Sequence, residues 1–206
     1  MVRDLQRTGA AAFLLAAAGW FGSGNAQAQA AGAKQIEVAV TFDALRANHV
    51  TTGNGFFLEG GSLELSAPVY RGFGVVAIVS GATHGSASSS TAGLSLVTVV
   101  FGPRFRFAPH HGRLSMFVHG LAGEADGFHS VFDLGSGPVS NPVNGTTDSA
   151  SSLAVEAGGG IDLLLHHGLG LRLVEADYLR TQLPNGAENV QNNLRLAAGI
   201  TFRWRR

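Results

Sequence analysis

The sequence predicts an all-β protein, folded as a closed antiparallel eight-stranded up-and-down β-barrel that crosses a membrane. The first observation is that apolar and polar residues alternate with a period of two, which is the pattern of strands with two different faces. The second is that charged residues make up only 14% of the chain, against roughly 25% in a typical soluble domain. The third is that no apolar run after residue 30 approaches the ~18 residues that a membrane helix needs.

The segment 1–30 has the pattern of a secretory signal peptide. Arg3 and Arg7 precede a short apolar stretch, and small residues of the kind found at cleavage sites follow it. We expect cleavage after Ala30, which leaves residues 31–206 as the barrel. The alternative is an uncleaved N-terminal helix.

The last predicted strand alternates most clearly, and the first repeats the pattern. Soluble β-sandwiches also alternate, so the period alone does not identify a membrane protein. The position of the charges favours a membrane barrel, because they gather on one face of each strand, and a narrow barrel in lipid is apolar outside and polar inside. In the last strand the apolar face consists of Leu194, Leu196, Ala198, Ile200, Phe202 and Trp204.

Eight strands are predicted, an even number as in bacterial single-chain barrels. Short connections follow the second, fourth and sixth strands, and the longest connection, rich in Gly, Ser, Asn and Pro, follows the fifth. Because short turns are periplasmic and long loops extracellular in such barrels, both termini are expected in the periplasm. The predicted strands are 34–46, 56–67, 73–83, 94–107, 113–124, 152–165, 169–180 and 192–204.

Two strands do not alternate cleanly. In the second, Glu59 falls on the apolar face, and a β-bulge at Gly60-Gly61 would move it. In the seventh, Arg172 falls on the face opposite to Glu175 and Asp177. We expect the two carboxylates to point inward and Arg172 to lie outside near the periplasmic end, where its long side chain can reach water.

The inward-facing charges form the main candidate site. An eight-stranded barrel is only just wide enough for its own side chains, so buried charges there must be paired. The favoured interpretation is an ion-pair network that plugs the barrel, and the alternative is a narrow proton or ion path; a nutrient porin is not expected at this diameter. The predicted inward charges are Glu37, Asp43, Glu64, Arg104, His119, Glu156, Asp162, Glu175, Asp177, Arg195 and Arg203.

Other motifs carry weaker signals for chemistry. Two short turns contain paired histidines, at 110–111 and 166–167, but adjacent residues point their rings apart and favour polar turn residues over a metal site. A serine follows a histidine at 84–86 and at 129–130. A nucleophilic serine needs a histidine as base and an acid that orients the histidine, and no acid stands at a spacing that would indicate such a triad. The long loop 124–152 is either a mobile surface loop or a site of adhesion or ligand contact.

Composition excludes several classes of site. The chain has no Cys, which excludes thiolate metal sites and a thiol nucleophile, and its formal net charge is zero, which leaves no basic footprint for nucleic acid. No metal and no cofactor are expected.

Four segments together carry a family resemblance: 101–105, 158–162, 171–179 and 192–202. They resemble the OmpA-like outer-membrane β-barrels, and are especially similar to small stand-alone barrels of the acidobacterial type. The resemblance implies no catalytic residues. No peptidoglycan-binding domain is expected after residue 206, so the cell-wall tethering of full-length relatives is not implied.

The C-terminal strand also resembles the signal that the barrel assembly machinery reads, in which a Gly precedes two aromatic or apolar residues one position apart. Gly199, Phe202 and Trp204 fit this pattern. Ala197 stands where a polar residue is usual, and Arg205 and Arg206 extend past the usual aromatic end.

We therefore expect an exported protein of the outer membrane of a Gram-negative bacterium, with a structural or interaction role that is porin-like or adhesin-like, and no enzymatic activity. The expected partners are outer-membrane lipid and lipopolysaccharide, the barrel assembly machinery and an unknown extracellular ligand, but no nucleic acid. Two alternatives stay open: a lipid A-modifying barrel enzyme and a soluble periplasmic barrel that carries a small ligand.

Overall fold

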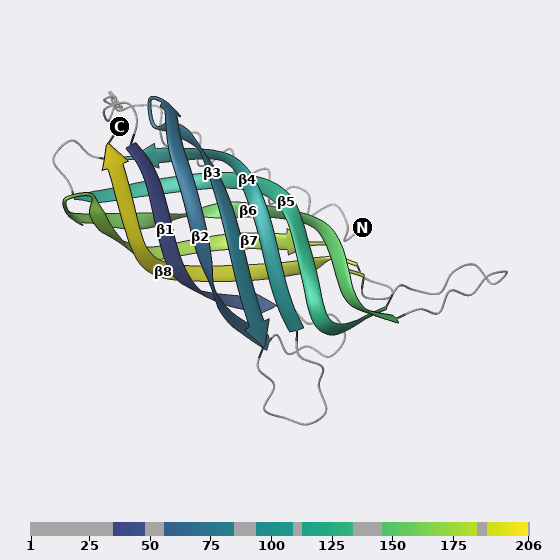
Figure 1. Ribbon diagram of the computed structural model, residues 1–206. Coiled ribbons are helices and arrows are strands. Elements are labelled where there is room, and N and C mark those ends of the chain that lie inside the picture. The colour runs from purple at the N-terminus through teal and green to yellow at the C-terminus, as the bar shows by residue number, and fades with distance from the viewer. Residues whose placement is uncertain are drawn as a thin grey trace, which may run out of the picture.

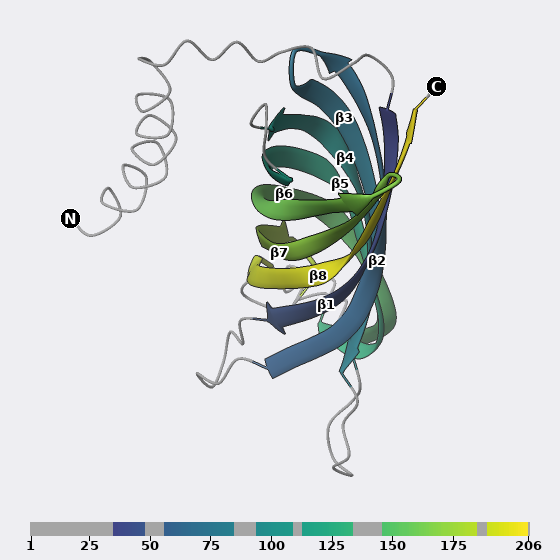
Figure 2. The same ribbon diagram turned by 90° about the vertical axis from the view of Figure 1, so that its left-hand side faces the viewer.

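Eight strands make up the barrel in the computed structural model, which describes residues 35–47, 56–84, 94–108, 113–133, 146–184 and 189–205. The described residues contain no helix long and apolar enough to cross a membrane. The strands run antiparallel in chain order around a ring (Figures 1 and 2): β1 Gln35–Ala47, β2 Phe56–Tyr70, β3 Phe73–His84, β4 Leu94–Phe107, β5 Leu114–Asp133, β6 Thr146–His166, β7 Leu169–Thr181 and β8 Gln191–Arg205.

The ring closes between the first and last strands. β1 pairs with β8 along its length, with Val40 opposite Ile200 and Val38 opposite Phe202. Every described strand therefore has a hydrogen-bonded neighbour on both sides, which a strand in hydrocarbon needs because no water can satisfy its backbone. This arrangement confirms the predicted closed eight-stranded up-and-down barrel.

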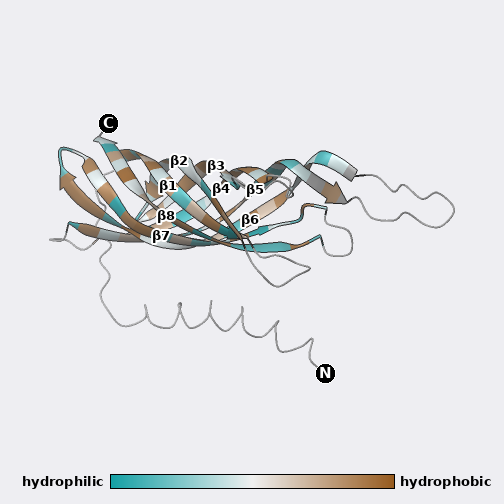
Figure 3. Ribbon diagram, turned by 90° about the horizontal axis from the view of Figure 1, so that it is seen from below, coloured by the Kyte–Doolittle hydropathy of each residue, from teal (hydrophilic) through white to brown (hydrophobic). Residues whose placement is uncertain are grey.

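The alternation of the sequence separates the interior from the outer surface. Along β1, Glu37, Thr41 and Asp43 are buried, whereas Val40 and Phe42 are 52% and 63% exposed. Figure 3 shows hydrophobic and hydrophilic residues alternating along the strands. An apolar outer surface around a polar interior is the distribution of a barrel in lipid and the reverse of a soluble one.

Two of the short connections are two-residue turns at the same end of the barrel. Arg71 and Gly72 have φ of 43° and 85°, and His167 and Gly168 have φ of 53° and 84°. Positive φ at both central positions is the geometry of a type I′ hairpin turn, whose twist matches that of the strands it joins. The Gly72 carbonyl accepts a hydrogen bond from Arg106 N at 2.8 Å, which ties the turn to β4.

β5 and β6 are longer than the sequence predicts, and they extend past their neighbours (Figure 1). Part of the predicted loop 124–152 is thus strand, paired through Phe128 with Ser149 and, after a register shift, Phe132 with Thr147. Phe132 is 6% exposed and belongs to the same apolar cluster as Leu183. Burial of this side chain gives the Gly- and Ser-rich extension a packed anchor that its composition does not reveal.

The bulge predicted at Gly60-Gly61 is wrong. Pairing runs without a shift through this point on both sides, with Asp43 and Ala82 opposite Gly60. A Cβ at Gly60 would collide with the Gly81 backbone, so close approach of the chains explains this glycine. Glu59 remains on the outer face and is exposed, near the start of β2 and so near the end of the barrel with the long connections.

The interior has an apolar part and a charged part. The apolar part lies mostly toward the ends of the strands that the long connections join, where Leu45, Leu58, Leu96 and Leu179 are at most 6% exposed. The charged part occupies the middle of the barrel and the end with the short turns.

Candidate functional site

The structure places all of the predicted inward charges in the interior. Ten of them, His119 among them, are buried, and Arg203 is half-buried near the short-turn end. Two further arginines join them, Arg106 and Arg172. The described interior therefore contains seven carboxylates, five arginines and one histidine, joined in one network.

Arg172 enters the interior because β7 contains a bulge. Register shifts occur in the pairing of β7 with both neighbours between Arg172 and Glu175, and Leu173 and Val174 are both exposed. One extra residue in the strand lets two side chains three positions apart point to the same side. The prediction that Arg172 reaches water from the outer surface is wrong: it is 2% exposed and lies in the centre of the network.

Arg172 connects four carboxylates. Its Nη1 donates to Glu64 Oε2 at 2.7 Å and to Glu175 Oε2 at 2.8 Å, and its Nε donates to Asp162 Oδ1 at 3.0 Å. Its Nη2 lies 3.6 Å from Glu37 Oε1. Since an uncompensated buried charge is costly, these contacts are what allow a guanidinium to be buried here.

Arg104 forms the second arginine contact with Glu64. Both of its terminal nitrogens donate to that carboxylate, one of them at 2.6 Å from Nη2 to Oε2. The Phe117 ring lies beside the same groups, with its centroid 4.1 Å from Arg104 Cζ and 4.5 Å from Arg172 Cζ. The ring face offers these cations an apolar but electrostatically favourable contact. Gly160 leaves the room for it, because a Cβ there would lie 2.8 Å from Phe117 Cζ.

A second group of ion pairs closes the end with the short turns. Arg106 donates to Glu37 Oε1 at 2.5 Å and to Asp162 Oδ2 at 2.9 Å. Arg203 also donates to Glu37, and its Nη2 lies 3.4 Å from Asp162 Oδ2. Two arginines from β4 and β8 therefore bridge the same two carboxylates across the barrel.

Arg195 organises the third group, nearer the apolar part. Its Nη2 donates to Asp177 Oδ2 at 2.7 Å and to Glu156 Oε1 at 2.8 Å, and its Nη1 donates to Asp43 Oδ2 at 3.3 Å. Asp43 also accepts from the Thr41 hydroxyl at 2.6 Å. The other oxygen of Glu156 has no hydrogen-bond partner within the part of the chain that the structure describes.

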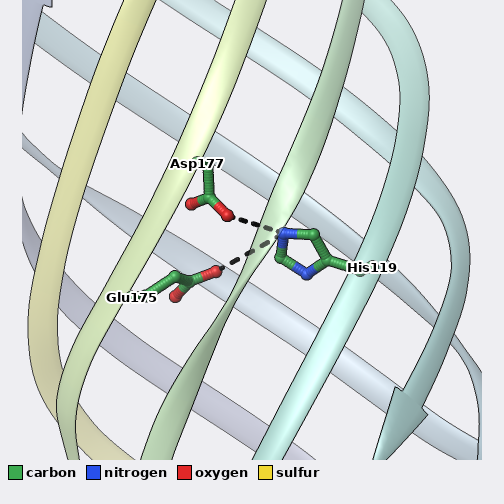
Figure 4. A group of neighbouring side chains, drawn as sticks. All are labelled: His119, Glu175 and Asp177. Atoms are coloured by element: carbon green, nitrogen blue, oxygen red, sulfur yellow. Dashed lines mark hydrogen bonds and ion pairs between the residues drawn. The ribbon is translucent and has the colours of Figure 1, made fainter. Parts of the chain in front are cut away.

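His119 joins the groups of Arg104 and Arg195. Arg104 Nη2 lies 3.0 Å from Nδ1 of the ring, and Nε2 lies 2.8 Å from Asp177 Oδ1 (Figure 4). A guanidinium can only donate, so Nδ1 is the acceptor and Nε2 carries the hydrogen that Asp177 accepts. His119 is thus held as the neutral Nε2–H tautomer.

Gly158 makes this contact possible. It lies on β6 directly between His119 on β5 and Asp177 on β7 in the strand pairing. A Cβ on Gly158 would collide with Asp177 Oδ1, so any other residue would block the space over β6 that the two side chains share.

His119, Glu175 and Asp177 form a group whose donor atoms could hold a metal, since one ligand atom from each lies within 4.8 Å of the others. Their hydrogen bonds do not fit a metal. Nε2 would have to give up its hydrogen, and the ring could not take it back at Nδ1, which faces a donor on Arg104. Glu175 and Asp177 are already paired with arginines. The arrangement is therefore an internal ion-pair network.

The other candidate residues do not assemble into a site. His166 and His167 lie in contact, with ring centroids 3.7 Å apart, so the expectation that adjacent histidines point apart is wrong; the positive φ of His167 accounts for it. The other histidine pair, 110–111, lies outside the described residues. His84 Nδ1 contacts the Phe57 carbonyl oxygen at 2.7 Å, and His129 Nδ1 lies 3.4 Å from Ser95 Oγ, both at exposed positions.

The predicted assembly residues lie on β8 near the barrel seam. A Cβ at Gly199 would collide with the backbone of β1, and Phe202 and Trp204 are exposed on the outer surface at the short-turn end. Trp204 pairs with Ile36 of β1. Their role in assembly stays a prediction.

Sequence reasoning missed three members of the network. Arg106 could have been found, because it stands two residues after Arg104 in a regular strand and must share its face. Arg172 could not be placed by alternation, because the bulge reverses the parity of its strand. Phe117 carries no charge that would single it out in the sequence, and only the packing shows that it lies against three arginines.

No protein-family model matches the chain, and no curated protein matches it. Solved structures resemble it at low sequence identity. Neisserial surface protein A aligns with a TM-score of 0.60 at 12% identity, over 83% of this chain and 99% of that one. Ail, the attachment invasion locus protein of Yersinia pestis, in complex with the heparin analogue sucrose octasulfate, aligns at 0.52 and 17%, over 83% and 100%. OprG from Pseudomonas aeruginosa aligns at 0.50 and 9%, over 84% and 97%. These likenesses establish the fold: the chain is built like small eight-stranded outer-membrane β-barrels.

Proposed function

We propose that this protein is exported through its segment 1–30, resides in the outer membrane of a Gram-negative bacterium, and has a structural or interaction role at the cell surface. The observation that carries the proposal is the combination of an apolar outer surface with an interior filled by its own ion pairs and apolar side chains. The apolar outer surface suits contact with lipid. Because the interior is filled by the protein's own side chains, the function is expected to depend on the surface of the barrel. We also propose that the protein is related to the OmpA-like outer-membrane β-barrels, and within them to the small stand-alone barrels of the acidobacterial type.

The interior is proposed to be closed to ions and nutrients. Arg172, Glu64 and Glu175 meet at the centre of the barrel and are each at most 2% exposed. A permeating ion would have to separate these pairs, and then pass the apolar cluster that includes Leu58 and Leu179. An adhesin-like role therefore fits better than a porin-like one.

The protein is proposed not to be an enzyme. The carboxylates Asp177, Glu175 and Glu64 are all held by arginines, which keeps them from serving as a general base. Among the described residues of the two histidine and serine motifs, His129 contacts a serine of another strand, Ser95, and both groups are exposed and 3.4 Å apart. A lipid A-modifying activity has no observation that favours it.

The proposed partners are outer-membrane lipid and lipopolysaccharide, the barrel assembly machinery and an extracellular ligand, without nucleic acid. The segment 124–152, which includes the extended hairpin, contains four acidic residues and no Lys or Arg. A cationic ligand suits this charge better than a sulfated sugar of the kind bound to Ail.

Two measurements test the proposal. Outer-membrane fractions extracted with detergent should give a band that migrates differently before and after boiling, whereas a soluble periplasmic barrel would appear in the periplasmic fraction. Purified protein in planar bilayers should show no steady channel currents. A variant with Glu64→Ala and Arg172→Ala removes the centre of the ion-pair network and tests its share of the barrier, because the apolar cluster with Leu58 and Leu179 stays in place. Steady currents from the parent would contradict a closed interior.

A further inference from the structure

Exposed charges are distributed unequally between the two ends of the barrel. Among the described residues, the exposed acids Glu59, Glu124 and Asp148 all lie toward the end with the long connections. At the opposite end the described acids, Glu37 and Asp162, are buried inside. The end with the short turns thus presents arginines to the outside without an exposed described carboxylate near them.

Arg71 occupies the turn between β2 and β3. Its guanidinium carbon lies 5.1 Å from the centroid of the Tyr70 ring, and Tyr70 itself is 63% exposed. Phe73 follows in the next strand, 56% exposed and packed against Phe105 with ring centroids 4.9 Å apart. Aromatic rings on the outer surface mark the level of the lipid headgroups in such barrels, so Arg71 is held at that level.

Arg113 lies at the next short connection around the ring, directly before β5. Its carbonyl oxygen accepts a hydrogen bond from Leu164 N at 2.7 Å, which fixes its backbone beside β6, and its side chain is exposed. Neither Arg113 nor Arg71 forms an ion pair with any residue that the structure describes. His166 and His167 are exposed at the third short connection.

We propose that Arg71 and Arg113 bind the phosphates of anionic phospholipids in the periplasmic leaflet of the outer membrane. This proposal rests on the proposed membrane location and orientation of the barrel. A guanidinium suits a phosphate because its planar donors match two phosphate oxygens at once. The turn of Arg71 favours a lipid over the cell-wall polymer, because it has only two residues and they lie between the exposed aromatic residues Tyr70 and Phe73.

The test compares the association of two spin-labelled lipids with the folded protein. The protein is folded into vesicles of phosphatidylcholine alone, and a heat-dependent change in gel migration verifies folding. Spin-labelled phosphatidylglycerol is then compared with spin-labelled phosphatidylcholine. We expect phosphatidylglycerol to associate more strongly, by about fivefold at a site with one contacting arginine, and expect this preference to disappear in high salt.

A matched pair of variants locates the preference. Arg71→Gln with Arg113→Gln should remove it, whereas Arg46→Gln with Arg180→Gln, at exposed positions near the opposite end, should leave it intact. Both double variants keep their side chains polar at exposed sites, and each must give the folded band before it is compared. The salt dependence of the parent provides a readout that needs no variant.

The outcomes separate the two proposals. Failure of the parent to fold into phosphatidylcholine vesicles would overturn the membrane barrel and this proposal with it. A folded parent that binds both spin-labelled lipids equally, or one whose preference survives Arg71→Gln with Arg113→Gln, overturns only the phospholipid site. Equal lipid binding combined with sedimentation on purified peptidoglycan that depends on Arg71 and Arg113 would assign the arginines to the cell wall instead.

Discussion

Arg195 Nη2 lies 2.7 Å from Asp177 Oδ2, and the two residues stand directly opposite each other on β8 and β7. The alternation of these two strands predicts this pairing, since it places both side chains inside near the same end. The structure adds that the same guanidinium also holds Glu156 and Asp43. The pair is therefore part of a group in which several charges depend on one another.

The first prediction concerns this group. Arg195→Gln should destabilise the barrel more than Asp177→Asn, because it leaves several buried carboxylates without their cation. We expect Arg195→Gln to lower the free energy of unfolding by about 3–5 kcal/mol, and Asp177→Asn to lower it by less. The double variant should cost less than the sum of the two. Urea unfolding in detergent measures these free energies, with the exposed Arg180→Gln as control. Strict additivity would show that the pair is not coupled.

The second prediction concerns the bulge in β7. Deletion of Leu173 should still give a folded barrel, because Arg172 and Glu175 would then stand two positions apart and point inward without a bulge. Deletion of Ala176 should prevent folding, because it moves everything on one side of the deletion to the opposite face. The heat-dependent gel shift distinguishes the two outcomes. Equal failure of both deletions would mean that the bulge itself is required.

The bulge also shows how far sequence can lead. Alternation identified eight strands, six of them within a few residues of their observed ends, and it placed charges such as Glu64 and Asp177 inside, because a period of two leaves only two choices per strand. A bulge changes that parity without a clear mark in the sequence. It was wrongly expected at Gly60-Gly61 and not foreseen at Leu173-Val174.

Contacts between strands distant in sequence were also beyond reach. The hydrogen bond between His119 and Asp177 passes over Gly158, and its existence depends on the register of three strands at once. The sequence shows each residue but not their relative height. In the same way, the extension of β5 and β6 depends on the packing of Phe132, which a Gly- and Ser-rich composition conceals.

The third prediction concerns the lipid-facing surface. Ile200 and Val40 stand opposite each other on β8 and β1, 45% and 52% exposed on the outer surface, and a change of either to Arg should lower the stability of the barrel by roughly 2–4 kcal/mol, because it would place a charge in hydrocarbon. The buried Thr41→Ser serves as an interior control that keeps the hydroxyl. Folding into phosphatidylcholine vesicles is the measurement. Unchanged folding of Val40→Arg and Ile200→Arg would mean that the inside and outside of the barrel are assigned wrongly.

The fourth prediction concerns metal. Because Arg104 occupies Nδ1 of His119 and Asp177 accepts the hydrogen of Nε2, zinc ions should not raise the unfolding temperature of the parent. His119→Phe should lower that temperature, through loss of both hydrogen bonds, and should also leave it insensitive to zinc. Stabilisation by zinc in the parent that is lost in His119→Phe would show that the cluster rearranges to bind a metal.

The last prediction concerns assembly. β8 closes the barrel by pairing with β1, and truncation before Leu194 would expose unpaired backbone groups of β1 and β7 to hydrocarbon, at several kcal/mol per group. The truncated chain should therefore fail to insert and should be degraded in the periplasm.

Phe202 and Trp204 allow a finer test of the same strand. Both are exposed on the outer surface, at 42% and 55%, so changing them to Ala removes little interior packing. If they form part of the signal for the assembly machinery, Phe202→Ala with Trp204→Ala should slow the appearance of the heat-modifiable band in cells more than it lowers the unfolding free energy in detergent. Phe73→Ala with Phe105→Ala, at two aromatic residues near the same end, is the matched control, because these residues lie outside the C-terminal strand. Equal slowing by both double variants would attribute the effect to the aromatic girdle in general and remove the special role of the last strand.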